Sequence, residues 1–386
     1  MIPEPSLAVR RRASVGRAFV LSVAALASGI PAGELVGQTG LIALRTARVA
    51  EGGASRTLPI LHIGGRRSGE ILNLPFRMTA SAWLNLDDPG ASLVNVEQLT
   101  LTKSLDAAEF RIGVGNVPWG LSEMRSPMDV LAPRALLWSA WDGPRLGGPL
   151  VGLTLFRGGS LLEAVALPFS RPMHLGGYSW RTWSGLSVRS DPTWDDRVAV
   201  GLRFTRTAGP VDLAISYING WDRSSGTRQI SGDSAKVDHP RAHQLGFEFE
   251  WAQGPSLSLR SEGALPVGTD GGGSRLLVGI EWYPAPYLSL LLEHSMSGRR
   301  AEFRTPLEDD LLVAVQLLGE QLRFKGRFFF DPRSSNTHYS IAARRMLGEL
   351  MSVEMELLGA GGDPLREPPL AFRQPNALLI SIARYF

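Results

Sequence analysis

The sequence predicts an all-β protein, a transmembrane antiparallel up-and-down β-barrel of about 16 strands, within a range of about 14 to 18. Three observations predict this fold. Segments of about ten residues alternate apolar and polar side chains. The connections between these segments alternate between short and long. The chain also ends on an apolar strand whose last residue is the aromatic Phe386.

Period-two alternation becomes clear at Leu72 and recurs to the end of the chain. Successive side chains of a strand point to opposite faces, so alternation marks one apolar and one polar face. In one segment Leu245, Phe247 and Phe249 oppose Gln244, Glu248 and Glu250. The segments start near residues 72, 92, 108, 149, 160, 196, 210, 239, 255, 274, 286, 309, 321, 336, 349 and 376. A soluble β-sandwich would alternate in the same way, because one of its faces packs and the other faces water.

The lengths of the connections distinguish the barrel from the sandwich. Tight turns are predicted at 105–107, 157–159, 207–210, 253–254, 284–286, 319–320 and 347–349. Longer links are predicted at 119–148, 170–195, 222–238, 266–273, 297–308 and 359–375. Short periplasmic turns alternating with long extracellular loops are typical of membrane barrels and require an even number of strands. A sandwich has no reason to sort its loops in this way.

The last twelve residues, Pro375 to Phe386, place Leu378, Ile380, Ile382 and Phe386 on one face. This stretch resembles the closing strand and assembly signal of Gram-negative outer-membrane β-barrels. One position departs from that pattern, because Arg384 stands third from the end, where an apolar residue or Tyr is usual. We expect Arg384 at the membrane edge, with its guanidinium reaching the headgroups. The resemblance implies outer-membrane lipid and lipopolysaccharide as surroundings, and the barrel-assembly machinery as a partner that binds the strand ending in Phe386.

The amino-terminus has the layout of a secretory signal peptide. Four arginines, Arg10, Arg11, Arg12 and Arg17, precede an apolar run from Ala18 to Ala27. That run is about half the length that a membrane-spanning helix needs. We expect a signal peptide over 1–27, a periplasmic arm or an additional strand over 28–70, and the barrel over 71–386. The protein is therefore expected in the bacterial outer membrane after export.

Composition excludes several classes of site. The chain has no Cys, so it has no disulfide, thiolate metal site or Cys nucleophile. Its net charge of +3 comes from 40 basic and 37 acidic residues spread along the chain, without the basic block that nucleic-acid binding requires.

Three stretches carry a resemblance to a diverse porin-like group of outer-membrane barrels. They are Glu109–Pro133, with Trp119-Gly120 after a strand, Phe204–Arg223, which ends I-N-G-W-D-R, and His239–Glu262. Together they cover most of residues 95–386. The resemblance implies a channel for a small solute, and it does not name the solute.

The predicted pore-lining residues come from the long link after Trp119 and from the polar faces of three strands. A barrel of this size leaves an aqueous lumen, whose selectivity depends on charged rings and on any loop folded inward. The link either folds inward as a constriction or stays outside as a solvated loop. The candidate residues are Glu123, Arg125, Asp129 and Arg134 in the link, Arg323, Lys325 and Arg327 in a basic row, and Glu248 and Glu250 in an acidic row. We expect the acidic row to oppose the basic row across the lumen.

We interpret the chain as a channel for passive or selective diffusion of small polar or anionic solutes, not as an enzyme. One alternative is a barrel for polysaccharide export or capsule surface assembly. A second is a barrel hydrolase with an active site at its rim, although no G-x-S-x-G motif is present. His239 and His243 lie at the start of a strand, where i, i+4 residues do not meet as they would on a helix, so no metal or cofactor is expected.

Overall fold

The computed structural model describes residues 37–51, 54–87, 92–124, 126–169, 171–176, 180–189, 198–222, 227–237, 239, 241–267, 273–298, 309–363, 365–367 and 370–386. The signal peptide expected over 1–27 lies outside these residues. Within them, no helix is long and apolar enough to cross a membrane.

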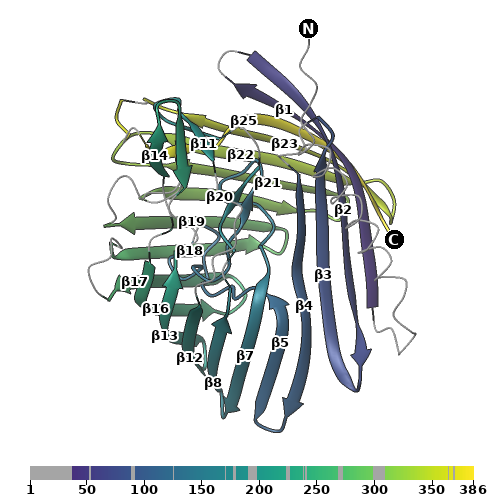
Figure 1. Cartoon of the computed structure of the whole chain (residues 1–386), viewed down its shortest axis with the longest axis vertical. Coiled ribbons are helices and arrows are strands. Elements are labelled where there is room, and N and C mark those ends of the chain that lie inside the picture. Colours follow the sequence, from purple (N-terminus) through teal and green to yellow (C-terminus); the bar gives the residue numbers. More distant parts are fainter. Residues whose placement is uncertain are drawn as a thin grey trace.

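Eighteen antiparallel strands form one closed ring (Figure 1). They are β1 (Gly37–Glu51), β2 (Ala54–Ile71), β3 (Leu74–Asn85), β4 (Leu93–Leu105), β5 (Ala108–Gly115), β7 (Gly148–Arg157), β8 (Ser160–Leu167), β12 (Ala199–Ala208), β13 (Val211–Trp221), β16 (Arg241–Gln253), β17 (Leu257–Pro266), β18 (Arg275–Ala285), β19 (Leu288–Ser297), β20 (Leu311–Leu318), β21 (Leu322–Phe330), β22 (Thr337–Met346), β23 (Met351–Gly361) and β25 (Asn376–Tyr385). Strand β25 pairs with β1, for example Ser381 with Arg45, and this closes the barrel. The all-β barrel is confirmed, with two strands more than the central prediction.

The two additional strands are β1 and β2, so the expected start of the barrel at residue 71 is wrong. Gly37–Glu51 and Ala54–Ile71 pair with each other along their whole length, and β2 also pairs with β3. Of the two possibilities expected for residues 28–70, a periplasmic arm or an additional strand, the described part from residue 37 onward forms strands of the wall. Their inner faces carry Ala43, Ala47, Val49, Leu58 and Ile60, all buried. Because part of the inner face is then apolar as well as the outer face, the polarity alternation that reveals the other strands is weak here.

The connections are sorted as predicted. One end of the barrel, the turn end, carries short turns such as Gly158-Gly159 and Leu72-Asn73, where φ is 53° and 60°. Two successive positive φ values fit the tight turn that joins twisted antiparallel strands. Leu72 was expected to begin a strand, but it belongs to this turn, and the strand begins at Leu74. The opposite end, the loop end, carries the long connections. In a membrane barrel the turn end is periplasmic and the loop end is extracellular.

The outer face is apolar, as the alternation predicted. Exposed outward residues include Leu213, Ile215, Leu245, Phe247, Phe249, Val278, Ile280, Trp282, Met355, Leu357, Ile380 and Ile382. Phe386 and Arg384 are exposed on the same face of β25, whereas Ala377 and Leu379 on the other face are buried inside. A closed barrel with an oily exterior satisfies every strand hydrogen bond in a lipid bilayer.

Two small sheets are built by the long connections. A five-stranded sheet, called the cap here, has the order β14 (Thr227–Ser231), β15 (Ser234–Val237), β11 (Ser187–Arg189), β10 (Arg181–Thr182) and β24 (Phe372–Arg373). Strands β6 (Ala135–Leu136) and β9 (His174–Leu175) form a parallel pair. Figure 1 shows cap strands β11 and β14 beside the ends of the yellow and green wall strands. The cap therefore lies at the loop end of the barrel.

Candidate functional site

The connection between β5 and β7, residues 116–147, folds into the barrel; we call it the inner loop. Its buried residues pack against inward-facing wall residues from two sides. One cluster joins Met124, Trp138 and Trp141 to Leu277, Leu312, Phe329 and Leu379. The other joins Trp119, Met128 and Leu131 to Leu150, Val165, Ala199 and Ile218. Of the two positions considered for this loop, the structure shows the inward one.

Buried carboxylates of the wall hold the inner loop by its backbone. Glu293 of β19 accepts hydrogen bonds from the N–H groups of Glu123 (3.2 Å) and Met124 (2.9 Å). Glu262 of β17 accepts from the Leu121 N–H at 3.0 Å. The Glu293 and Glu262 residues are 0% and 1% exposed, so their charges require such donors. The loop is therefore positioned by groups that its own sequence does not contain.

Arg260 of β17 completes this attachment from the same wall. Its guanidinium donates to the Leu121 carbonyl oxygen at 2.7 Å and pairs with Glu281 at 2.5 Å and with Glu293 at 3.6 Å. One cation thus compensates two wall carboxylates and also contacts the loop. Sequence reasoning missed Arg260, Glu262 and Glu293. The alternation shows that these residues lie on the polar face of a strand, but it does not show which polar-face residues contact the inner loop.

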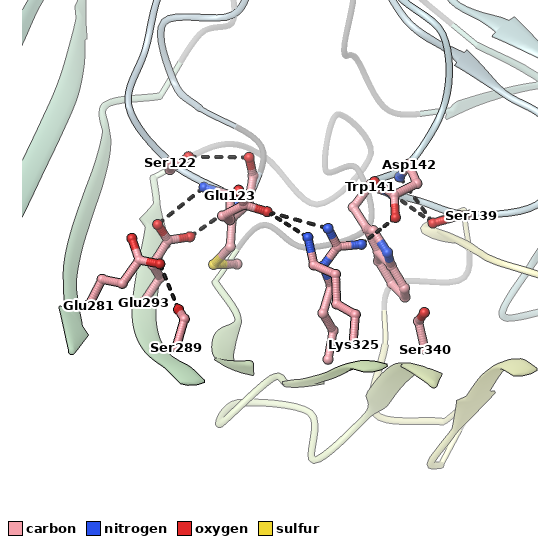
Figure 2. Close-up of polar contacts among 12 residues, drawn as sticks. Ser122, Glu123, Ser139, Trp141, Asp142, Glu281, Ser289, Glu293, Lys325 and Ser340 are labelled. Atoms are coloured by element: carbon pink, nitrogen blue, oxygen red, sulfur yellow. Dashed lines mark hydrogen bonds and ion pairs between the residues drawn. The ribbon is translucent and has the colours of Figure 1, made fainter. Parts of the chain in front are cut away.

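Glu123 turns its side chain to β21, two strands along the wall from β19 (Figure 2). Its Oε2 accepts from Lys325 Nζ at 3.2 Å and from Arg327 at 3.3 Å. Arg327 also donates to Asp142, at the far end of the inner loop. Burial acts to raise the pKa of Glu123, but attraction to Lys325 and Arg327 outweighs it, so this pKa lies below its ordinary value. Three predicted site residues, Glu123, Lys325 and Arg327, therefore meet.

The remaining predicted residues lie apart from that contact. Asp129 binds Arg134 at 3.5 Å and Arg145 at 3.3 Å within the inner loop. Arg323 is exposed on the inner face near the turn end. Arg125 lies outside the described residues.

The expected opposition of acidic and basic rows across the lumen is wrong for Glu248. This side chain is paired with Arg203 of nearby β12, at 2.6 Å. Arg203 also binds Glu163 at 3.2 Å. Glu250 accepts from Ser258 of the adjacent strand at 2.8 Å. These charges are compensated along the wall because neighbouring strands bring opposite charges closer than the far side of the barrel does.

A cavity of about 690 Å³ lies between the wall and the root of the inner loop. Its lining includes Arg66, Arg77 and Arg111 from β2, β3 and β5, and Glu97 is the acidic residue among the lining groups. Strand register places the three arginines on the inner face: Arg66 faces Thr79, Ser68 faces Arg77, and Arg111 faces Thr102. Thr79, Gln98, Thr100 and Asn116 add polar groups. Arginines therefore outnumber carboxylates in the lining of this cavity.

Arg77 and Arg111 could be placed by alternation, because each lies on the polar face of its segment. Arg66 could not, since its segment shows only weak alternation and was left open between a periplasmic arm and an additional strand. The sequence-derived site therefore lacked the arginines that line the cavity.

No group of three or more His, Asp or Glu suited to a metal occurs in the part of the chain that the structure describes. His243 bonds Tyr217 on the outer face at 2.6 Å, and His62 stacks on Trp83 with ring centroids 3.6 Å apart. Nδ1 of His239 contacts the Asp222 carbonyl oxygen at 3.0 Å. These contacts of His62, His239 and His243 are to aromatic residues and to backbone.

Comparisons with known proteins detect a likeness in architecture. Neither a protein-family model nor a curated protein matches the chain. Among solved structures, two mutants of the Rhodopseudomonas blastica porin align over 91% of this chain and 99% of their own, at 12% and 11% identity, with TM-scores of 0.46 and 0.45. A triple mutant of the same porin aligns over the same shares at 12% identity with a TM-score of 0.45. At these identities and TM-scores the likeness supports no conclusion about family or role, and the closed ring of strands with an apolar exterior is an observation on this chain itself.

Proposed function

We propose that this barrel is an outer-membrane channel for small polar solutes, with a preference for anions. The observation that carries the proposal is the cavity lined by Arg66, Arg77 and Arg111. Guanidinium groups bind carboxylates and phosphates through paired hydrogen bonds and stay charged at every physiological pH. A row of them on one wall lowers the energy of an anion in the lumen, which is how charged rings set selectivity.

Passage through the other half of the barrel requires movement of the inner loop. The inner loop and the wall form an apolar core at the loop end, and water and ions do not cross a dry core. The attachment to Glu262, Glu293 and Arg260 consists of hydrogen bonds and ion pairs, which can break and re-form. We infer a channel that opens when the inner loop moves, with the cavity as its selective part.

Planar-bilayer recording tests the channel directly. Wild type is expected to open intermittently and to show an anion-selective reversal potential under a salt gradient. Arg66, Arg77 and Arg111 changed together to Gln should reduce or reverse this preference. Arg384→Gln is the matched control, because that arginine faces outward, and its reversal potential should equal wild type.

Glu293→Gln tests the moving loop in the same recordings. Loss of the charge weakens the hold on the Glu123 and Met124 N–H groups, so the open time should rise severalfold. Folded wild-type protein without conductance, together with a silent Glu293→Gln variant, would exclude the channel.

The filled loop end also favours a second candidate, a barrel for assembly of polysaccharide at the cell surface. Such a protein would use the cap as a platform and would not need an open lumen. Silent bilayers combined with binding of capsular polysaccharide by the purified protein would favour this function.

A further inference from the structure

The outer face of the barrel carries a band of basic residues near the turn end. Among the described strand residues there, the charged side chains that face outward include Lys103 of β4, Arg157 of β7, Arg206 of β12, Arg345 of β22 and Arg384 of β25, all exposed. Strand carboxylates of the same region face the lumen instead, among them Glu109, Glu163, Asp212, Glu250 and Glu281. In a membrane barrel this end meets the periplasmic leaflet, so the band lies at the height of that leaflet's headgroups.

Two arginines of this band lie on either side of one serine. Strand β8 runs between β7 and β12 (Figure 1), and its Ser160 pairs in register with Arg157 and with Arg206. Neighbouring strands are about 4.8 Å apart, which places the two arginine Cα atoms about 10 Å apart. Arg206 Nη1 donates to Ser160 Oγ at 3.0 Å. The Thr207 N–H donates to the Gly159 carbonyl oxygen at 3.0 Å, which ties β12 to the turn before Ser160. We call Arg157, Ser160 and Arg206 the arginine–serine cluster.

The positive charges of the arginine–serine cluster are not compensated within the described residues. No carboxylate there forms an ion pair with Arg157 or Arg206, including the one in the neighbouring turn between β4 and β5. The turns that adjoin the cluster, Gly158-Gly159 and Gly209-Pro210, are uncharged. Ser160 accepts a hydrogen bond from Arg206 and keeps its own hydroxyl hydrogen for another acceptor. The cluster thus offers two cations and a donor to a group with several acceptor oxygens.

Apolar side chains continue from the cluster toward the loop end on the same outer face. The next three rows across β7, β8 and β12 are Leu155, Leu162 and Phe204, then Leu153, Ala164 and Leu202, then Val151, Ala166 and Val200. The members from β7 and β12 are 36% to 46% exposed. In two of these rows β8 contributes only Ala, whose side chain is shorter than those on either side. An extended acyl chain lying over Ala164 and Ala166 contacts leucines and valines of both neighbouring strands, which removes apolar surface from water.

We propose that the arginine–serine cluster binds the phosphodiester group of one anionic phospholipid of the periplasmic leaflet, whose acyl chains lie over Ala164 and Ala166. Guanidinium groups bind phosphate oxygens through paired hydrogen bonds. Two cations favour a lipid with net negative charge, such as phosphatidylglycerol, because they repel the ammonium group of a zwitterionic lipid. The inference rests on the apolar exterior of the barrel and not on conduction through its lumen.

Native mass spectrometry of the full-length protein in detergent tests the site, with phosphatidylglycerol and phosphatidylcholine of the same acyl chains as probes. Wild type should bind the first phosphatidylglycerol at least about fivefold more tightly than phosphatidylcholine. Arg157→Gln and Arg206→Gln should each weaken binding of the first phosphatidylglycerol at least about fivefold, because each removes one cation. Ser160→Ala, which keeps both cations, should weaken it less.

Arg48→Gln is the matched control. Arg48 is exposed on the outer face of β1 near the loop end and donates to Ser55 Oγ at 3.3 and 3.2 Å. Its partners in register are Thr57 and Leu378, so no second arginine stands beside it. The phosphatidylglycerol affinity of Arg48→Gln should therefore equal that of wild type.

Arg206→Lys keeps the charge but loses the paired donors, so its affinity should lie between those of wild type and Arg206→Gln. Melting temperatures show which variants are folded, and Arg206→Lys tests the site where Arg206→Gln does not fold. Equal binding of phosphatidylglycerol by wild type and by a folded variant carrying both Arg157→Gln and Arg206→Gln would overturn the site, as would equal affinity of wild type for the two lipids. An equal loss in Arg48→Gln would show attraction to the overall charge in place of a site and would also overturn it.

Discussion

The inward-facing residues of the same strands differ between the two ends of the barrel. Near the loop end, inward residues such as Leu277, Leu312 and Phe329 join a packed core with the inner loop. Nearer the turn end, the same strands turn Glu281, Gln316 and Lys325 inward. One half is held by burial of apolar surface and the other by ion pairs beside water. The comparison indicates that residues near the loop end mainly stabilise the fold, whereas residues of the same strands near the turn end supply the charges that would set selectivity.

The largest expected effect is a loss of packing in the loop half. Trp141 is 4% exposed and stacks on Phe329 with ring centroids 4.4 Å apart. Trp141→Ala should lower the free energy of unfolding by about 3–5 kcal/mol, because it leaves a cavity in a dry core. Denaturant titration in detergent measures this. Trp282→Ala, at a half-exposed outer position, should cost much less; equal losses would mean that the inner core adds no stability.

A smaller effect is expected from pH acting on the loop half. Burial, together with repulsion from nearby Arg171, lowers the pKa of His174 to about 4. The unfolded chain then binds more protons than the folded one between about pH 6.5 and 4, so stability falls as the pH falls through that window. The loss should be about 1–3 kcal/mol. Unfolding free energies of wild type and His174→Gln at pH 7.5 and 4.5 measure it, and an unchanged pH dependence in the variant would contradict this assignment.

The smallest effect is expected in the turn half. Lys325 and Glu123 are 30% and 41% exposed, so water screens their ion pair. Lys325→Gln should change the free energy of unfolding by less than about 1 kcal/mol. It should shift the reversal potential toward cations instead, since it removes a lumen charge. A loss as large as that of Trp141→Ala would show that the two halves are not distinct.

The lowered pKa of Glu123 in the folded protein makes its contact with Lys325 and Arg327 sensitive to acid. Because the pKa of this carboxyl is held below its ordinary value in the folded protein, its contribution is present above the unfolded pKa and is lost as the pH falls through the folded one. The turn-half contact therefore persists at pH values where His174 already weakens the loop half.

Much of the fold could be predicted because lipid imposes one rule on every outward position. The alternation of Ile380, Ile382 and Phe386 predicts the outer face of the last strand. The sorting of short and long connections predicts a closed ring with an even number of strands. Residues 28–70 stayed open between a periplasmic arm and an additional strand, because part of the inner face of β1 and β2 is apolar against the core, which weakens the contrast between faces. The sequence also did not decide whether the loop after Trp119 folds inward or stays outside, because no local pattern shows which surface its tryptophans contact.

The candidate site was predictable only in part. Glu123, Lys325 and Arg327 could be chosen as charged residues of the lumen, but not their direct contact. The bond between the Leu121 N–H and Glu262 joins residues 141 positions apart, and it exists only because the barrel closes.

By itself, the sequence determined the alternation, the sorting of the connections and the charge on the inner face, because each follows from the period of a strand and from the solvent on its two sides. Only the tertiary structure decided that Arg66 lines a cavity, that Glu293 holds the inner loop, and that the inner loop packs against the inner wall near the loop end. These depend on distances across a closed ring, which no local pattern of residues records.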